Sequence, residues 1–214
     1  MKCFIVPVTA YEQNCSVLIC EQTHKAAVVD PGGDLQKIID VLEKEGAELE
    51  KVLLTHGHMD HCAIADDVRQ RFSVPIEGPE KADAFWIDKL PEWCKMSNFP
   101  HADAFVPDRW LEGGDEVTFG NQRLQVIHCP GHTPGHVVFY HPELKLALVG
   151  DVLFKGSIGR TDFPMGDHDA LINGIREKLW PLGDQVTFVP GHGPTSTFGE
   201  ERATNPFVAD ARYR

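Results

Sequence analysis

The sequence lacks the features that mark secreted, membrane and nucleic-acid-binding proteins. Its 214 residues contain no run of Lys or Arg and have a formal net charge of -12, which excludes affinity built on neutralising nucleic-acid phosphates. The N-terminal segment lacks the apolar stretch of a secretory signal, and no later apolar run reaches membrane-spanning length. We therefore expect a cytoplasmic protein with neither a nucleic-acid nor a membrane partner.

Disulfide and repeat signals are also missing. The chain has six cysteines but no Cys-x-x-Cys pair, and without a secretory signal we expect reduced core residues. We find no fixed-period repeat and no low-complexity segment, and the charged and apolar fractions are those of an ordinary globular protein. We expect one domain over residues 1–214 and a monomer.

Short β-type runs fill both halves of the chain, and helical patterns appear singly between them. Apolar spacing predicts strands over 4–6, 17–19, 26–29, 52–54, 117–119, 124–127, 137–140, 146–149 and 186–189. It predicts helices over 35–42, 60–72 and 171–179, with Asp34 available as a cap of the first helix and Gly46 as its stop. This order favours an α+β fold, a four-layer αββα sandwich of two mixed β-sheets.

Residues 77–110 do not follow this pattern. Prolines and aromatic residues alternate there without a clear period. We expect a partly helical excursion that walls a cleft, although aromatic residues in such a segment also serve simply as packing.

The densest chemical signal is the segment 55–61, which reads Thr-His-Gly-His-Met-Asp-His directly after a predicted strand. Imidazole nitrogens and carboxylate oxygens are ligands of borderline divalent metals. His56 and His58 lie two positions apart and share one side of an extended segment, whereas the start of a helix turns Asp60 and His61 elsewhere. One ion could take the first pair and a second ion the other.

Three more ligand-type residues, His132, Asp151 and His192, lie beside glycines at the ends of predicted strands. Assigning His132 to the first ion, His192 to the second and Asp151 as a bridge leaves room for a shared water. Asp151 and Asp60 would hold this water as the attacking hydroxide. Asp30, also at a strand end, is either a turn cap or a partner that orients a ligating imidazole.

With these residues in this order the chain resembles the metallo-β-lactamase superfamily, whose motif His-x-His-x-Asp-His is followed by His, Asp and His. Thr133-Pro134-Gly135-His136, Gly150-Asp151-x-Leu-Phe and the stretch from Gly159 to Pro164 resemble its glyoxalase II group, the hydroxyacylglutathione hydrolases. The match is to the short bacterial form without a C-terminal helical domain. His128 and His136, which flank the third ligand, either support the ligands from behind or, as we favour, serve local structure.

The resemblance implies the αββα sandwich and a binuclear site with two divalent ions, zinc first, with iron and manganese as alternatives. One metal would be held by His56, His58 and His132, the other by Asp60, His61 and His192, with Asp151 bridging.

The implied activity is hydrolysis of S-lactoylglutathione to D-lactate and glutathione, a step of methylglyoxal detoxification. Arg160 stands where larger enzymes of this group carry a substrate-binding basic residue, and Lys155 lies on the same loop. Either cation could pair a substrate carboxylate. The alternative for both is a solvated surface cation.

Rival functions share this fold. A persulfide dioxygenase, which uses one iron and molecular oxygen, also has a Gly-Arg-Thr-Asp-Phe stretch. An RNA-processing nuclease could use the same ligands, but the acidic balance disfavours it. A lactonase or β-lactamase is less supported because no secretion signal is present, and a purely structural metal site would be closed by four ligands.

Overall fold

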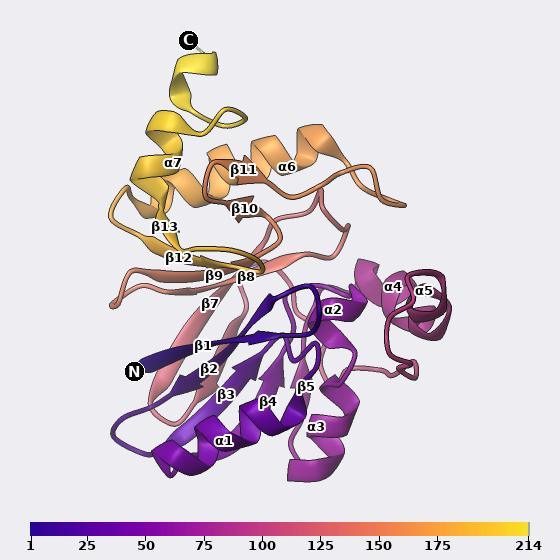
Figure 1. Ribbon diagram of the computed structural model, residues 1–214. Helices are drawn as coiled ribbons and strands as arrows, with labels where there is room; N and C mark the ends of the chain where they lie inside the picture. The colour runs from indigo at the N-terminus through magenta and orange to yellow at the C-terminus, as the bar shows by residue number, and fades with distance from the viewer. Residues whose placement is uncertain (214) are drawn as a thin grey trace.

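Two mixed β-sheets pack face to face, with helices on their outer faces (Figure 1). The computed structural model describes residues 1–213. The first sheet consists, in spatial order, of β1 (Lys2–Val8), β2 (Gln13–Ile19), β3 (Lys25–Val29), β4 (Glu48–Leu53) and β5 (Ile76–Glu77). The second consists of β13 (Ser196–Thr197), β12 (Thr187–Pro190), β9 (Leu146–Gly150), β8 (Val137–His141), β7 (Gln122–His128) and β6 (Glu116–Phe119). A small hairpin pairs β10 (Leu153–Phe154) with β11 (Ser157–Ile158).

Helices cover the outer face of each sheet. The α-helices are α1 (Leu35–Glu45), α2 (Met59–Cys62), α3 (Ala65–Phe72), α4 (Ala84–Asp88), α5 (Leu90–Met96), α6 (His168–Gly174) and α7 (Phe198–Thr204). Shorter helical turns are η1 (Lys81–Asp83), η2 (Ile175–Leu179), η3 (Trp180–Leu182) and η4 (Asp210–Tyr213). In Figure 1, α1 and α3 lie below the first sheet and α6 and α7 above the second, while α4 and α5 stand to one side.

Three apolar layers separate these elements, as a four-layer sandwich requires. Successive residues of a strand point to opposite faces of its sheet. Accordingly, Ala26 and Val28 of β3 pack toward the helices, whereas Ala27 and Val29 pack between the sheets. In β8, Val137 and Phe139 face the first sheet, while Val138 packs under α6. The predicted αββα architecture is confirmed.

Most predicted elements are confirmed, and the departures have local causes. The expected helix over 60–72 is wrong as one helix: it is divided into α2 and α3, because the backbone N–H of Ile64 donates to the carbonyl of Pro31 at 3.2 Å. Gly46 does end α1 in a left-handed conformation. Asp34 does not cap this helix through its side chain, because its carboxylate accepts instead from the backbone N–H of Thr9 at 3.0 Å.

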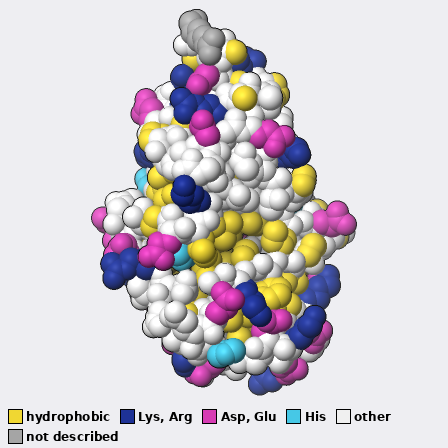
Figure 2. Space-filling view, turned by 90° about the vertical axis from the view of Figure 1, so that its left-hand side faces the viewer, with side chains coloured by type: hydrophobic (Ala, Val, Ile, Leu, Met, Phe, Trp, Pro, Cys, Tyr) yellow, Lys and Arg dark blue, Asp and Glu magenta, His cyan; other side chains and the backbone are white. Residues whose placement is uncertain are grey.

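The cysteines are free, and five of the six are buried, as expected for core residues. No helix within residues 1–213 is long and apolar enough to cross a membrane. On the face shown in Figure 2, hydrophobic side chains gather at mid-height, and charged side chains are concentrated above and below them.

Candidate metal centre

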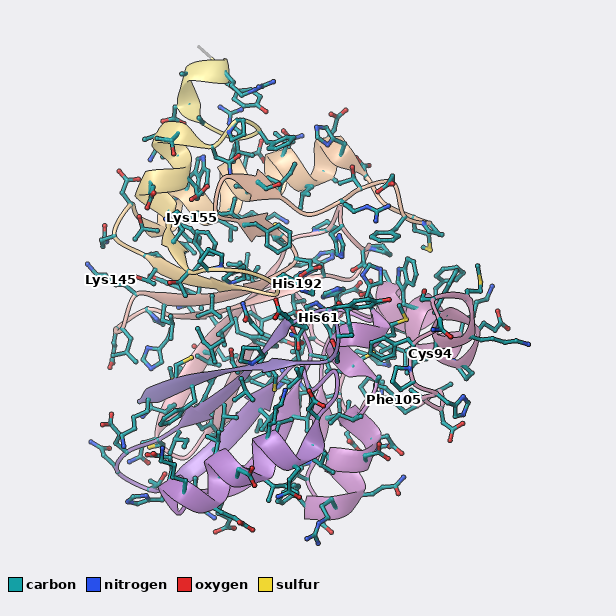
Figure 3. All side chains as sticks on the ribbon, in the orientation of Figure 1. His61, Cys94, Phe105, Lys145, Lys155 and His192 are labelled. Atoms are coloured by element: carbon teal, nitrogen blue, oxygen red, sulfur yellow. The ribbon has the colours of Figure 1, made fainter. Side chains whose placement is uncertain are left out.

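The seven residues predicted as ligands come together at one edge of the two sheets. Strands β3 and β4 run parallel in one sheet, and β9 and β12 run parallel in the other, so their carboxyl ends meet at this edge. The segments after β4, β7, β9 and β12 supply the residues His56, His58, Asp60, His61, His132, Asp151 and His192. His61 and His192 lie close together between the two halves of the molecule (Figure 3).

Three groups of side chains offer ligand atoms within 4.8 Å of one another. Two of them share no residue: the imidazoles of His56, His58 and His132 form one, and Asp60, His61 and His192 form the other. The third consists of Asp30, His56 and His61 and lies behind them. The first two groups coincide with the two ligand sets that the sequence suggested. In the second group, the Asp60 Oδ2 atom lies 3.1 Å from Nε2 of His192.

Asp151 lies between the two groups. Its Oδ1 atom is 3.3 Å from Nε2 of His61, and its Oδ2 atom is 3.5 Å from Nε2 of His132 and 3.8 Å from Nε2 of His192. Burial opposes charge on both Asp151 and His61, but their mutual attraction outweighs it, lowering the pKa of Asp151 and raising that of His61. One carboxylate thus faces both groups at once.

The residues fit divalent metal ions because several of their buried polar atoms lack a partner. Nε2 of His56, His58 and His61 and Oδ1 of Asp151 make no hydrogen bond within the described part of the chain. A buried unsatisfied polar atom costs about 1–3 kcal/mol, so such a cluster is expected only where a ligand completes it. Burial and neighbouring imidazoles also hold the pKa of His56 well below its ordinary range, which keeps this ring neutral, as a metal ligand must be.

Hydrogen bonds on the outer side orient three of these imidazoles. Nδ1 of His132 donates to the carbonyl of Arg160 at 2.7 Å, and Nδ1 of His192 donates to the carbonyl of Tyr11 at 3.1 Å. Because a carbonyl oxygen only accepts, a neutral ring so bonded presents the lone pair of Nε2 to the centre. His56 is held through Thr55, whose hydroxyl lies 3.0 Å from its Nδ1 atom.

Asp30 joins these outer contacts. Its Oδ2 atom accepts from the Thr55 hydroxyl at 2.6 Å and lies 2.9 Å from Nδ1 of His61, while Oδ1 accepts from the Thr55 backbone N–H at 2.7 Å. Of the two roles suggested by the sequence, orientation of an imidazole is therefore the observed one. Sequence reasoning missed Thr55 and Gln13, whose amide nitrogen lies 3.3 Å from Nδ1 of His61.

His136 supports two ligand-type residues from behind, whereas His128 supports a local turn. Nε2 of His136 accepts the backbone N–H of Asp151 at 3.0 Å, and its ring stacks on His56 with centroids 4.6 Å apart. His128 donates to the carbonyl of Pro134 at 2.9 Å and so closes the turn that carries His132.

Glycine is needed beside the centre: a Cβ at Gly191 would lie 2.0 Å from Oδ1 of Asp151.

Asp83 was not predicted, yet it links two ligand-bearing segments. Its fully buried carboxylate accepts from the backbone N–H of Gly57 at 2.8 Å, the hydroxyl of Thr133 at 2.8 Å and the N–H of Gly135 at 2.5 Å. Burial raises the pKa of Asp83 to about 6. No local pattern could have revealed this role, because its partners are distant in sequence.

A cleft of about 760 Å³ opens directly onto the centre. Besides ligand-type residues it is lined mainly by apolar side chains, including Trp86 and Trp93 of the excursion that the sequence placed at a cleft wall. Arg160 lies in the lining, with its guanidinium paired to Asp162 through contacts of 2.9 and 2.8 Å. Lys155 is outside the lining: it is half-exposed and lies 3.8 Å from Glu200, to the side of His61 and His192 (Figure 3).

An αββα sandwich with clustered histidine and aspartate side chains at the sheet edge and an open cleft beside them is the arrangement of a metal-dependent enzyme. Residues 8–197 match the family model of the metallo-beta-lactamase superfamily, and the chain belongs to this superfamily.

Relatives cover nearly all of the chain. The hydroxyacylglutathione hydrolase GloC of Haemophilus influenzae is 45% identical over 209 residues, covering 97% of this chain and 98% of its own. Among solved structures, the BLEG-1 B3 metallo-beta-lactamase is 34% identical with a TM-score of 0.89, covering 97% of this chain and 99% of its own. TTHA1623, solved in a di-iron-bound form, is 32% identical with a TM-score of 0.87, covering 96% and 100%.

Proposed function

We propose that this metallo-hydrolase cleaves S-2-hydroxyacylglutathione thioesters, with S-lactoylglutathione as the reference substrate. The observation that carries the proposal is the pair of ligand groups with Asp151 between them, with unpaired buried polar atoms in both groups and an open cleft beside them. The 45% identity to a relative named hydroxyacylglutathione hydrolase supports this substrate class.

In this proposal two divalent ions bind, zinc in the first instance. His56, His58 and His132 would hold one ion and Asp60, His61 and His192 the other, and Asp151, which lies between the two groups, would be available to both. Iron is the alternative, supported by the relative that was solved in a di-iron-bound form. The His and Asp donors suit either metal.

Divalent ions held there lower the pKa of a bound water and stabilise negative charge on a carbonyl oxygen. The chain contributes orientation. Asp60 and Asp151 accept hydrogen bonds from the water, while Asp30, Thr55 and backbone carbonyls keep the imidazoles fixed. The water oxygen bonds to the thioester carbon, the C–S bond breaks, and the thiolate leaves without a strong general acid. The products are the 2-hydroxy acid and the thiol.

A second candidate is β-lactam hydrolysis, favoured by the 34% identity to a solved protein described as a B3 metallo-beta-lactamase. The same attack on a carbonyl would open a lactam. We rank it second because the more similar relative, at 45% identity, is named a thioester hydrolase.

The test is steady-state turnover on a panel that contains S-D-lactoylglutathione, a chromogenic cephalosporin, glutathione persulfide with oxygen detection, and labelled RNA. Metal content is measured on the same sample. We expect thioester hydrolysis to exceed the other reactions in kcat/KM. Metal-loaded enzyme that leaves the thioester intact but consumes another member of the panel would overturn the proposal.

A further inference from the structure

Three aromatic rings form a continuous wall beside the candidate centre. Trp86 packs against Trp93 with ring centroids 4.8 Å apart and against Phe163 at 6.2 Å. The same wall touches the ligand-type imidazoles: His58 lies 4.3 Å from Trp86 and 4.9 Å from Phe163, between centroids. All three aromatic residues line the cleft. An apolar surface therefore lies in direct contact with His58, one of the proposed metal ligands.

The cleft offers little to a charged group. Arg160 is the one Lys or Arg residue among its described lining residues. Its guanidinium makes two contacts to Asp162 and lies 4.5 Å above the ring of Phe163, at the exposed rim of the cleft. Asp60 and Asp151, which are also in the lining, are metal ligands in the proposed function and are therefore not free to bind a substrate group. Selection inside the cleft must therefore depend mainly on apolar contact.

We propose that the wall of Trp86, Trp93 and Phe163 is an acyl pocket, and that the enzyme prefers 2-hydroxyacyl thioesters with an aromatic or bulky apolar substituent over the lactoyl thioester. This inference rests on the proposed thioesterase function and names its substrate class more narrowly.

Polarity decides which side of the thioester faces the wall. Two arms leave the scissile carbonyl, the acyl substituent and the thiol carrier. A glutathione carrier bears peptide groups and carboxylates that lose hydration without compensation against three aromatic rings. An aromatic acyl substituent instead replaces water with ring contacts. The peptide arm is thus left to the open, solvated side of the cleft.

The experiment compares S-D-mandeloylglutathione with S-D-lactoylglutathione, which share the carrier and the 2-hydroxyl group and differ in a phenyl against a methyl substituent. We expect kcat/KM to be about tenfold or more higher for the mandeloyl thioester, since each methylene-sized apolar contact is worth roughly tenfold or more in discrimination. Trp93→Ala and Phe163→Ala should each reduce this ratio toward one, because they lower kcat/KM for the mandeloyl thioester more than for the lactoyl thioester.

Phe207→Ala is the matched control, because Phe207 is an exposed aromatic residue outside the cleft lining. It should leave the ratio unchanged. Trp93→Phe and Phe163→Leu keep an apolar side chain and should retain part of the preference, which separates pocket contacts from misfolding. Metal content and thermal unfolding are measured for every variant.

A wild-type ratio of one or less would overturn the acyl pocket while the proposed function stands. So would a high ratio that survives both alanine variants. Metal-loaded wild type that hydrolyses neither thioester would overturn the proposed function and the acyl pocket together.

Discussion

The Asp30 Oδ2 atom lies 2.9 Å from Nδ1 of His61, in the completely buried interior behind the candidate centre. The same oxygen accepts the hydroxyl of Thr55, which in turn lies against His56. One carboxylate thus orients an imidazole from each of the two ligand groups. Such outer partners fix the tautomer and direction of a ligating ring.

Replacing Asp30 should therefore weaken metal binding without removing any proposed ligand. We expect Asp30→Ala to lower metal affinity about 10–100-fold, as is typical for loss of an outer hydrogen-bond partner. Competition with a chromophoric chelator measures this affinity. Asp40→Ala, at an exposed position of α1, should bind metal like the wild type. Equal affinities for the two variants would show that Asp30 has no orienting role.

The Arg160–Asp162 pair leads to a prediction about substrate charge. Both side chains are 67% exposed, so water and salt screen most of their mutual attraction. Asp162→Asn should free the guanidinium and lower KM for the anionic S-lactoylglutathione by about two- to fivefold, with an effect that fades at high salt. Arg160→Ala should raise KM and leave metal content unchanged.

An uncharged N-acetylcysteamine thioester is the control substrate for this pair. Its KM should not respond to Asp162→Asn, because it carries no carboxylate. If Arg160→Ala leaves KM for S-lactoylglutathione unaltered, Arg160 does not contact the substrate.

Asp83 should contribute to the pH dependence of stability. Its pKa is raised from 3.8 to about 6 in the fold, so the folded protein holds this proton more tightly than the unfolded chain. Protonated Asp83 therefore stabilises the folded state at low pH. This contribution to the free energy of unfolding, up to about 3 kcal/mol, is lost as pH rises from about 4 to about 6.

The measurement is the unfolding free energy of chelated, metal-free wild type and Asp83→Asn across this pH range. The difference, wild type minus variant, should decrease from pH 4 to pH 6.5. Asp88→Asn, at an exposed site on α4, should follow the wild type at every pH. Parallel curves for wild type and Asp83→Asn would contradict the assignment.

The ligand-type residues could be predicted from sequence because they lie in short motifs directly after predicted strands. His56, His58 and Asp60 stand in one short motif after β4, and the glycines beside His132, Asp151 and His192 marked turns at other strand ends. Short apolar runs predicted β3 and β8 because these strands bury both of their faces, and alternating apolar residues predicted β6 because it buries only one.

The contacts and the helix break that were not predicted depend on segments far apart in sequence. Gln13 reaches His61 across 48 positions, and Asp83 reaches Gly135 across 52, so no local pattern reports either contact. The break between α2 and α3 likewise depends on Pro31, which lies far from Ile64 in sequence. The ion pair of Arg160 and Asp162 differs from these, because its two residues lie only two positions apart in sequence.

We propose that Asp151 joins two metal sites that hydrolyse a thioester. The most direct measurement is metal stoichiometry and S-D-lactoylglutathione turnover of Asp151→Ala, beside wild type and the exposed-site control Asp169→Ala on α6. We predict that Asp151→Ala loses most bound metal and at least about 100-fold in kcat/KM, since even outer-shell losses cost 10–100-fold. Asp169→Ala should match the wild type. Full turnover by Asp151→Ala with wild-type metal content would contradict the account.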